Sequence, residues 1–451
     1  MNRTALGLVA VALLFAQAGA AEEPLTLHQC VTRAKQHNPL VKAARSGVAA
    51  VEQQAKEAWW GWFPTIRLRT VATLIPPQNA DARNPGDPDL SSANFWTKTD
   101  LEAYMPLYTF GKISAMKDMA RHGEAALGAL VRAAEDEVQY LVTRAWYALA
   151  LSQEFERLIG DGERYVKKAK DRLKRLQDED SDDFDQDDLF RLRIYEADVR
   201  QKVLDNQKLG ALSRSGLSLA MGSEKGAPLA LPAEIPLEPL DVTVKGLDHY
   251  VDLAYGHRPE LHAARKKIDV QRAEVDRKWA DFFPDFFIAG SFTYAWSSVD
   301  QQNTVFSSVV FNALGGGAAV GLQLTLDFPG KVARYRKAQA DLDQASHEAD
   351  GVRLKLRLEL EEVWRDVKDL HEMVAINKDA EKAARALFVS RVQAYEDGVD
   401  DSVTIKDVLG QAVTWIARRS EFLKTVYGFN TQWAHLARVV GVDLMPRSPL
   451  P

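Results

Sequence analysis

The chain has 451 residues, of which 46% are hydrophobic and 27% are charged, so its composition is globular and excludes a wholly disordered protein. Only one apolar run approaches the length of a membrane-spanning helix, and it lies at the very N-terminus, which excludes a protein built of many transmembrane helices. The formal net charge of -6 gives no overall electrostatic reason to bind nucleic acid. The single cysteine, Cys30, excludes an intrachain disulfide and a cysteine-based metal site.

Residues 1–20 are predicted to be an export signal, with a short basic start, an apolar core and an Ala-Gly-Ala cleavage site ending at Ala20. The apolar core is too short for the alternative, a membrane anchor. We interpret Cys30 as a buried small residue and not as a lipidated one, because the bulky His28 and Gln29 precede it. An exported chain without disulfides indicates a bacterial envelope protein.

Several motifs occur twice, at a constant offset of 219 or 220 positions, which predicts an internal duplication. The recurring pairs are His37-x-Pro39 and His257-x-Pro259, Trp59 and Trp279, Phe63-Pro64 and Phe283-Pro284, Gly111-Lys112 and Gly330-Lys331, and Gly222 and Gly441. The predicted organisation is a first structural repeat at 21–222, a Pro-rich linker at 223–246, a second repeat at 247–442 and a C-terminal tail at 443–451.

Each repeat is predicted to contain the same three kinds of helix, as judged from apolar spacing and from the position of proline. A first helix is expected at 26–61 and 247–280, a long helix at 112–177 and 331–396, and a last helix at about 186–221 and 405–440. A helix of about 65 residues would be roughly 100 Å long, which no ordinary globular core needs. Two of the shorter helices placed end to end would match one long helix, an arrangement that suits the wall of a cylinder.

Four segments alternate between apolar and polar or small residues, as strands do, and they lie at 65–75, 94–105, 286–296 and 319–327. Each is about ten residues long, the length that a tilted strand needs to cross a bilayer. The long polar loops expected at 76–93 and 297–315 are typical of extracellular loops of membrane barrels. Four aromatic residues near the strand ends are predicted to form an interfacial girdle: Tyr104, Tyr108, Tyr294 and Trp296. The alternative is a soluble antiparallel sheet that is buried on one face.

Four strands cannot close a membrane barrel, and open strand edges are not tolerated in lipid. If these strands cross the membrane, the protein must therefore pool strands from several copies. Two copies would supply eight strands and three copies would supply twelve, the latter with room for a lumen.

The chain resembles the TolC-like outer-membrane efflux family over almost the whole mature sequence, about 25–442. The resemblance rests on three duplicated motifs. They are NPLVKAAR and RPELHAAR in the first helix of each repeat, the WFP and FFP turns before the first strand, and the LYTFGK and LDFPGK segments that lead into the long helices. It implies a mainly α protein with a membrane β-barrel portion, in which a homotrimer forms a twelve-stranded barrel that continues into a periplasmic α-helical tunnel. It also implies a location in the outer membrane of a Gram-negative bacterium, in contact with outer-membrane lipid.

The resemblance further implies a function and partners. Family members form the exit duct of tripartite efflux or type I secretion systems, and a periplasmic adaptor protein connects them to an inner-membrane pump. The tunnel entrance of the family aligns with the helix–helix turns at 177–188 and 396–407. The implied entrance residues are Arg172, Asp178, Asp182, Asp183, Asp185, Arg391, Tyr395, Gly398 and Asp401. The first turn departs from the second, because Glu179 stands where Gly398 stands, which weakens the expectation of adaptor docking there.

The first of these turns reads DEDSDDFDQDD and holds eight acidic residues. One interpretation is a solvated turn that precedes a helix N-terminus. Another is an acidic ring that selects cations at the entrance. A calcium loop would need the EF-hand glycine and the terminal glutamate, which this turn lacks.

The sequence offers little support for catalysis. No GxSxG, HExxH or P-loop motif is present, and the histidines are scattered. We therefore expect no catalytic site, no metal site and no cofactor, and energy for transport would come from partners. The alternative function is a structural periplasmic coiled-coil protein with a soluble β cap.

Overall fold

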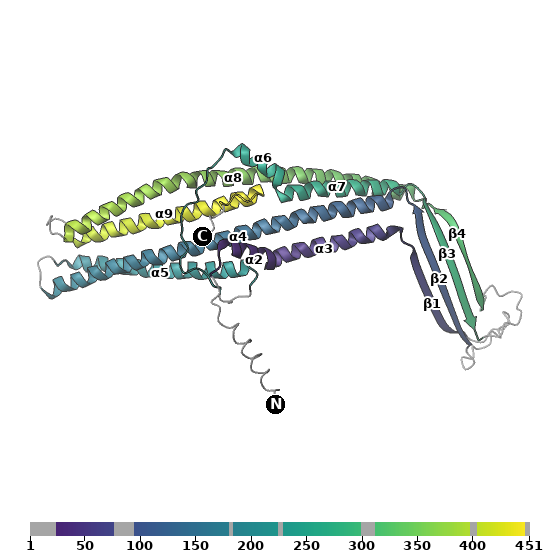
Figure 1. Ribbon diagram of the computed structural model, residues 1–451, viewed down its shortest axis with the longest axis horizontal. Helices are drawn as coiled ribbons and strands as arrows, with labels where there is room; N and C mark the ends of the chain where they lie inside the picture. Colours follow the sequence, from purple (N-terminus) through teal and green to yellow (C-terminus); the bar gives the residue numbers. More distant parts are fainter. Residues whose placement is uncertain are drawn as a thin grey trace, which may run out of the picture. The chain divides into compact units, whose positions relative to one another are not determined.

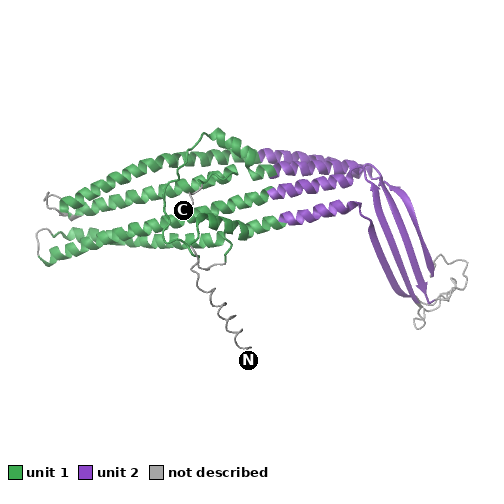
Figure 2. Ribbon diagram, in the orientation of Figure 1, with its two compact units in different colours: residues 1–46, 129–262, 352–451 green, residues 47–128, 263–351 purple. Residues whose placement is uncertain are grey.

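The structure is a computed structural model that describes residues 24–75, 94–179, 184–223, 229–298, 312–396 and 404–446. The predicted export signal, the loop at 76–93 and most of the loop at 297–315 lie outside these ranges. The chain divides into two compact units, each built from several stretches of the sequence (Figure 2). Unit 1 comprises residues 1–46, 129–262 and 352–451, and unit 2 comprises residues 47–128 and 263–351.

The described elements occur in the order helix, helix, strand, strand, long helix and helix in each half of the chain (Figure 1). In the first half they are α2 (Leu27–His37), α3 (Pro39–Trp59), the 3-10 turn η1 (Trp60–Trp62), β1 (Thr65–Ile75), β2 (Asn94–Tyr108), α4 (Lys112–Asp178) and α5 (Gln186–Ala220). In the second half they are α6 (Leu247–His257), α7 (Pro259–Ala280), β3 (Asp285–Ser297), β4 (Ala313–Gln323), α8 (Phe328–Glu396) and α9 (Ile405–Val440). Within the described ranges, we find no helix with the length and hydropathy needed to span a membrane.

The first helix of each half is broken, and the prediction of one continuous helix at 26–61 and at 247–280 is wrong. Asn38 has φ −61° and ψ 131°, and Arg258 has φ −58° and ψ 117°, so both leave the helical region immediately before a proline. The residue before proline is sterically disfavoured in the α conformation, whereas proline itself is well suited to the first position of a new helix. A helix therefore ends at His37 or His257, and the next begins at Pro39 or Pro259.

Each break receives the C-terminal end of another helix of unit 1. The Asn38 side-chain amide donates to the carbonyl oxygen of Ala220 at 2.7 Å, where α5 ends. The Arg258 guanidinium donates to the carbonyl oxygen of Arg438 at 2.6 Å, in the last turn of α9. These bonds satisfy carbonyl groups that a helix C-terminus leaves without a partner. The shorter helices thus meet end to end, in the arrangement expected from their lengths.

The core of unit 1 lies between the helices that converge at these breaks. Its most deeply buried large side chains come from four long helices: Leu149 from α4, Leu217 from α5, Leu360 and Val367 from α8, and Phe429 and Leu436 from α9. Cys30 belongs to the same core and has no exposed surface, which confirms the interpretation of a buried residue. Burial raises the pKa of its thiol to about 11, so the thiolate is scarce at neutral pH.

Unit 2 holds one four-stranded antiparallel sheet in the order β1-β2-β3-β4 (Figure 1). The prediction of the fourth strand at 319–327 is wrong, because β4 pairs with β3 from Ala313↔Ala295 to Gln323↔Asp285. The glycine run at 315–317 lies inside this strand and not before it. The residues after the strand lead into α8, where the Asp327 carboxylate accepts a hydrogen bond from the Gly330 backbone N–H at 3.1 Å.

Candidate functional site

The sheet of unit 2 has one apolar face. Residues that are paired across an antiparallel sheet share a face, and the register places Leu68, Leu101, Phe292 and Gly316 in one such row. The other large apolar side chains of this face are Ile66, Leu74, Phe95, Phe286, Ile288, Leu314, Val320 and Leu322, and they are between 37% and 74% exposed. The polar residues on this face include Thr70, Thr97 and Thr99 of β1 and β2. On a soluble protein an exposed apolar surface of this size would be an interaction site or an aggregation risk, whereas a membrane strand presents such a surface to lipid.

The opposite face of the same strands consists mostly of polar or small residues, and its large apolar or aromatic members include Val71, Trp96, Tyr104 and Phe287. In the register of β1 and β2, Arg67 lies opposite Glu102 and Arg69 lies opposite Asp100, and the Asp100 carboxylate forms an ion pair with Lys98 at 2.9 Å. The Asp100 carboxylate also accepts a hydrogen bond from the Thr293 hydroxyl at 2.8 Å. The part of this face on β4 consists of small residues and one glutamine: Ala313, Gly315, Gly317, Ala319, Gly321 and Gln323. Such a face suits the aqueous interior of a barrel.

The four predicted girdle residues do not lie on one face. Tyr294 and Trp296 lie on the apolar face, close to the end of β3 that is remote from the helices. Tyr104 instead lies on the polar face, in register with Thr65 and Ala289. Tyr108 is the last residue of β2 and is 55% exposed.

A second group of exposed aromatic residues lies where the sheet meets the helices, and it was not among the predicted girdle residues. Trp59, Trp60 and Phe63 are between 60% and 65% exposed, and Trp279 is 54% exposed. They belong to the ends of α3 and α7 and to the turns that follow. The duplicated Trp and Phe-Pro positions are the sequence signal that marks them, but these positions lie outside the strand ends, where the girdle was predicted.

The predicted entrance residues belong to two helix–helix turns of which the structure describes the flanks. Asp182, Asp183, Gly398 and Asp401 lie outside the described residues. Of the remaining residues, Arg172 and Asp178 lie in the last two turns of α4, and Arg391 and Tyr395 lie in the last two turns of α8.

Each of these turns leads into a capped helix. Asp185 caps α5, because its carboxylate accepts a hydrogen bond from the Asp187 N–H at 2.9 Å. At the start of α9, Thr404 and Asp407 form a capping box, and the hydrogen bonds from Thr404 lower the pKa of Asp407. Both caps fix the point at which the chain re-enters a helix after the turn.

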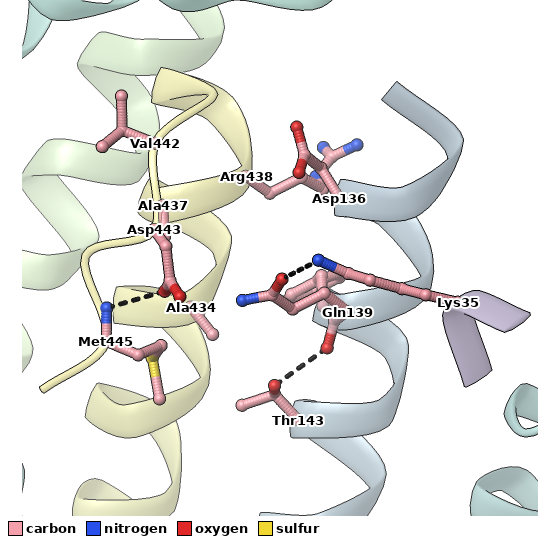
Figure 3. A pocket seen from close by; sticks show the side chains of 11 residues that line it. Lys35, Asp136, Gln139, Thr143, Ala434, Ala437, Arg438, Val442, Asp443 and Met445 are labelled. Atoms are coloured by element: carbon pink, nitrogen blue, oxygen red, sulfur yellow. Dashed lines mark hydrogen bonds between the residues drawn. The ribbon is translucent and has the colours of Figure 1, made fainter. Parts of the chain in front are cut away.

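A small polar pocket of about 130 Å³ lies in unit 1, between α2, α4, α9 and the segment that follows α9 (Figure 3). Lys35 reaches into it and donates to the Gln139 side-chain oxygen at 2.6 Å. Arg438 donates to Glu137 at 2.6 Å and to Glu359 at 2.9 Å, so it ties α9 to both α4 and α8. Asp136 shares the pocket with these cations and forms no hydrogen bond or ion pair with any residue that the structure describes.

Burial raises the pKa of Asp136 to about 6, and the nearby Lys35 only partly opposes this shift. Because the folded-state pKa lies above the unfolded value of about 3.8, the carboxyl group stabilises the folded protein at acid pH, and this contribution is lost as the pH rises through 6. We therefore expect Asp136→Asn to raise the melting temperature at pH 8, by a stabilisation of about 1–3 kcal/mol, and to change it little at pH 4.

Melting curves measured between pH 4 and pH 8 test this expectation for Asp136. The matched control is Asp171→Asn, which makes the same change at an exposed position of α4 and should shift neither curve. Equal curves for the Asp136 variant and the unaltered protein at pH 8 would contradict the assignment.

Comparison with known proteins supports the outer-membrane interpretation of this geometry. Residues 250–442 match the family model described as "Outer membrane efflux protein". A region of 233 residues is 26% identical to the alkaline protease secretion protein AprF of Pseudomonas aeruginosa, and this match covers 48% of the chain and 42% of that relative. The resemblance to the TolC-like outer-membrane efflux family is confirmed.

Solved structures share the TolC-like fold over nearly the whole chain. The outer membrane protein VceC of Vibrio cholerae superposes with a TM-score of 0.72 at 18% identity, covering 92% of this chain and 96% of that one. The open state of the MtrE outer membrane channel of Neisseria gonorrhoeae superposes with a TM-score of 0.73 at 14% identity, covering 94% and 91%. The mainly helical class with few strands is thereby confirmed, as is the location in the outer membrane with an extension into the periplasm.

Proposed function

We propose that this TolC-like protein is the outer-membrane exit duct of a tripartite efflux or type I secretion system, and that it passively conducts cargo from a periplasmic adaptor and an inner-membrane pump to the exterior. The observation that carries the proposal is the four-stranded sheet with one exposed apolar face and one polar face. The AprF relative is described as a secretion protein, which favours a secretion or efflux role over a purely structural one.

The sheet alone cannot close, because β1 and β4 are its two edges. Unpaired backbone groups on these edges would have no water to bind in the hydrocarbon layer. Pairing β4 of one copy with β1 of the next closes the sheet, and three copies give a barrel of twelve strands. The apolar face then meets lipid and the polar face lines the lumen.

The helices of unit 1 support the same assembly. The α5 helix carries a stripe of exposed apolar residues that share one face: Phe190, Ile194, Leu204, Leu212 and Leu219. Three of their counterparts, 219 positions later on α9, are buried: Leu409, Leu423 and Thr431. Because α9 packs against α4 of its own chain, through Arg438–Glu137 and Tyr140–His435, most of its stripe is covered, although Val413, the counterpart of Ile194, is 44% exposed. The α5 stripe lacks such cover within the residues that the structure describes.

By the duplication, α5 should pack against α8 of a neighbouring copy as α9 packs against α4. The α8 helix presents a matching exposed stripe of Leu354, Leu358, Ile376 and Leu387. The two stripes run in opposite directions along their helices, so that Leu219 would face Leu354 and Phe190 would face Leu387. This arrangement joins each copy to the next through different surfaces and closes as a ring.

A cross-linking experiment tests the assembly. Leu219→Cys combined with Leu354→Cys is expected to give covalent products that end at the trimer when a short bis-maleimide is added in detergent. Cys30 should not react, because it is buried. The control pairs Leu354→Cys with Gln207→Cys, which lies off the α5 stripe and should give monomers. A ladder that ends at the dimer, or equal products from both pairs, would contradict the trimeric ring.

The conduit itself is tested with the purified protein in planar lipid bilayers. We expect stepwise ionic conductance without any nucleotide, because the chain has no nucleotide-binding motif. A protein that remains trimeric but never conducts ions would refute the proposed duct function and favour a structural role.

The periplasmic entrance residues named above remain part of this proposal, together with the adaptor that would dock at the turns.

A further inference from the structure

An exposed aromatic cluster lies at the junction of α3 and β1. Trp59 is 65% exposed, Trp60 is 63% exposed and Phe63 is 60% exposed. Only a short turn separates them from Thr65, the first residue of β1, and the apolar face of the sheet begins one residue later at Ile66. Indole rings in such a position prefer the boundary between hydrocarbon and water.

One lysine is held on this cluster. The Lys117 ammonium of α4 lies 3.9 Å from the centre of the Trp59 ring, in cation–π contact. No carboxylate among the described residues lies within ion-pair distance of it. Its neighbours on α4 differ in this respect, because Lys112 pairs with Asp285 at 2.8 Å and Arg121 pairs with Asp118 at 3.2 Å.

The ammonium of Lys117 therefore has no carboxylate partner among the described residues, and its position is set by the indole ring of Trp59 beside the start of β1. An ammonium group has three N–H donors and can approach a phosphate as a point charge. The helical end of the sheet faces the periplasm in an outer-membrane protein whose helices extend there. The lipid within reach is a phospholipid of the periplasmic leaflet.

We propose that Lys117, Trp59 and Trp60 bind the phosphate headgroup of an anionic phospholipid in the periplasmic leaflet, with its acyl chains lying along Ile66 and Leu68. Lys117 donates to the phosphate, and the two indole rings pack against the glycerol and the first methylene groups. The site anchors the sheet at a fixed depth. This inference rests on the outer-membrane location and not on the passage of cargo.

Native mass spectrometry of the detergent-solubilised protein, titrated with dioleoylphosphatidylglycerol or dioleoylphosphatidylcholine, tests the proposal. We expect the unaltered protein to bind phosphatidylglycerol more tightly than phosphatidylcholine. Lys117→Gln should weaken phosphatidylglycerol binding about fivefold and abolish the preference, since one basic residue near a membrane surface has an effect of about this size. Lys117→Arg should restore it.

The matched control is Lys267→Gln, which removes a lysine of α7 that is already paired with Glu348 at 2.6 Å. It should leave the lipid preference intact, and the circular dichroism spectrum of each variant verifies folding. Equal binding of both lipids by the unaltered protein, or an equal loss in both lysine variants, would overturn the proposal. Displacement of phosphatidylglycerol by inorganic phosphate would also overturn it, because the site would then recognise free phosphate. None of these outcomes depends on whether the protein conducts.

Discussion

Replacing Gly222 by alanine is expected to lower the free energy of unfolding by about 2–4 kcal/mol. Gly222 ends α5 with φ +70°, a conformation that disfavours any side chain. A Cβ atom at this position would lie 2.5 Å from the carbonyl oxygen of His37, which is backbone at the α2–α3 break and cannot rotate away. The same displacement would strain the hydrogen bond between Asn38 and Ala220. The loss should appear as a lower melting temperature in detergent.

The matched control for Gly222 is Gly128→Ala. Gly128 lies within α4, and nothing lies within 4 Å of a Cβ atom built there. Alanine should therefore stabilise this helix by about 0.5–1 kcal/mol. Gly441 ends α9 with φ +75° against the α6–α7 break and should behave like Gly222. If Gly222→Ala and Gly128→Ala melted alike, the close approach at the break would not matter to stability.

The sequence predicted that the shorter helices stack end to end, but it did not predict the helix breaks at which they meet. Proline is compatible with the first turn of a helix, so Pro39 and Pro259 did not interrupt the predicted helices. The helices are interrupted by the extended backbone of Asn38 and Arg258. This conformation is stabilised by hydrogen bonds from their side chains to carbonyl groups about 180 residues away on α5 and α9. No local pattern contains that information.

The fourth strand was predicted at 319–327 instead of Ala313–Gln323 for a related reason. Leu324 and Leu326 alternate with polar residues, so the strand was predicted to extend to residue 327. The glycine and alanine residues at 315–319 show no alternation of large and small residues, so they were not predicted to be part of the strand. In the structure, pairing with β3 fixes the strand, and the small residues lie opposite large ones: Gly316 opposite Phe292 and Gly321 opposite Phe287. The strand is thus determined by its partner more than by its own side chains.

The other three strands had stronger local signals, because each alternates large apolar residues with polar or small ones along most of its length. Their predicted bounds differ from the structure by at most three residues. The same alternation separates the two faces of the sheet, so the candidate membrane surface followed from sequence, whereas the junction aromatics Trp59 and Trp60 did not. Their exposure depends on how α3 ends above β1, which is a tertiary property.

The assignment of the two faces can be tested at neighbouring positions of β3. Phe292 lies on the apolar face between Leu101 and Gly316, and Ser291 lies on the polar face between Glu102 and Gly317. Arginine at the midplane of a lipid-facing strand is expected to destabilise a barrel by about 2–4 kcal/mol, so Phe292→Arg should sharply reduce the folded protein recovered in the outer-membrane fraction.

Ser291→Arg adds the same charge one residue away and should leave the recovery nearly unchanged. The new guanidinium would point into water, opposite the Glu102 carboxylate, and Gly317 offers no side chain to clash with it. Its expected effect is on the pore, where a bulky cation should lower single-channel conductance. If Ser291→Arg were the variant that failed to assemble, the charged face would be the one in contact with lipid. The sheet would then present its Ser291 face to lipid and its Phe292 face to the lumen, the reverse of the proposed orientation.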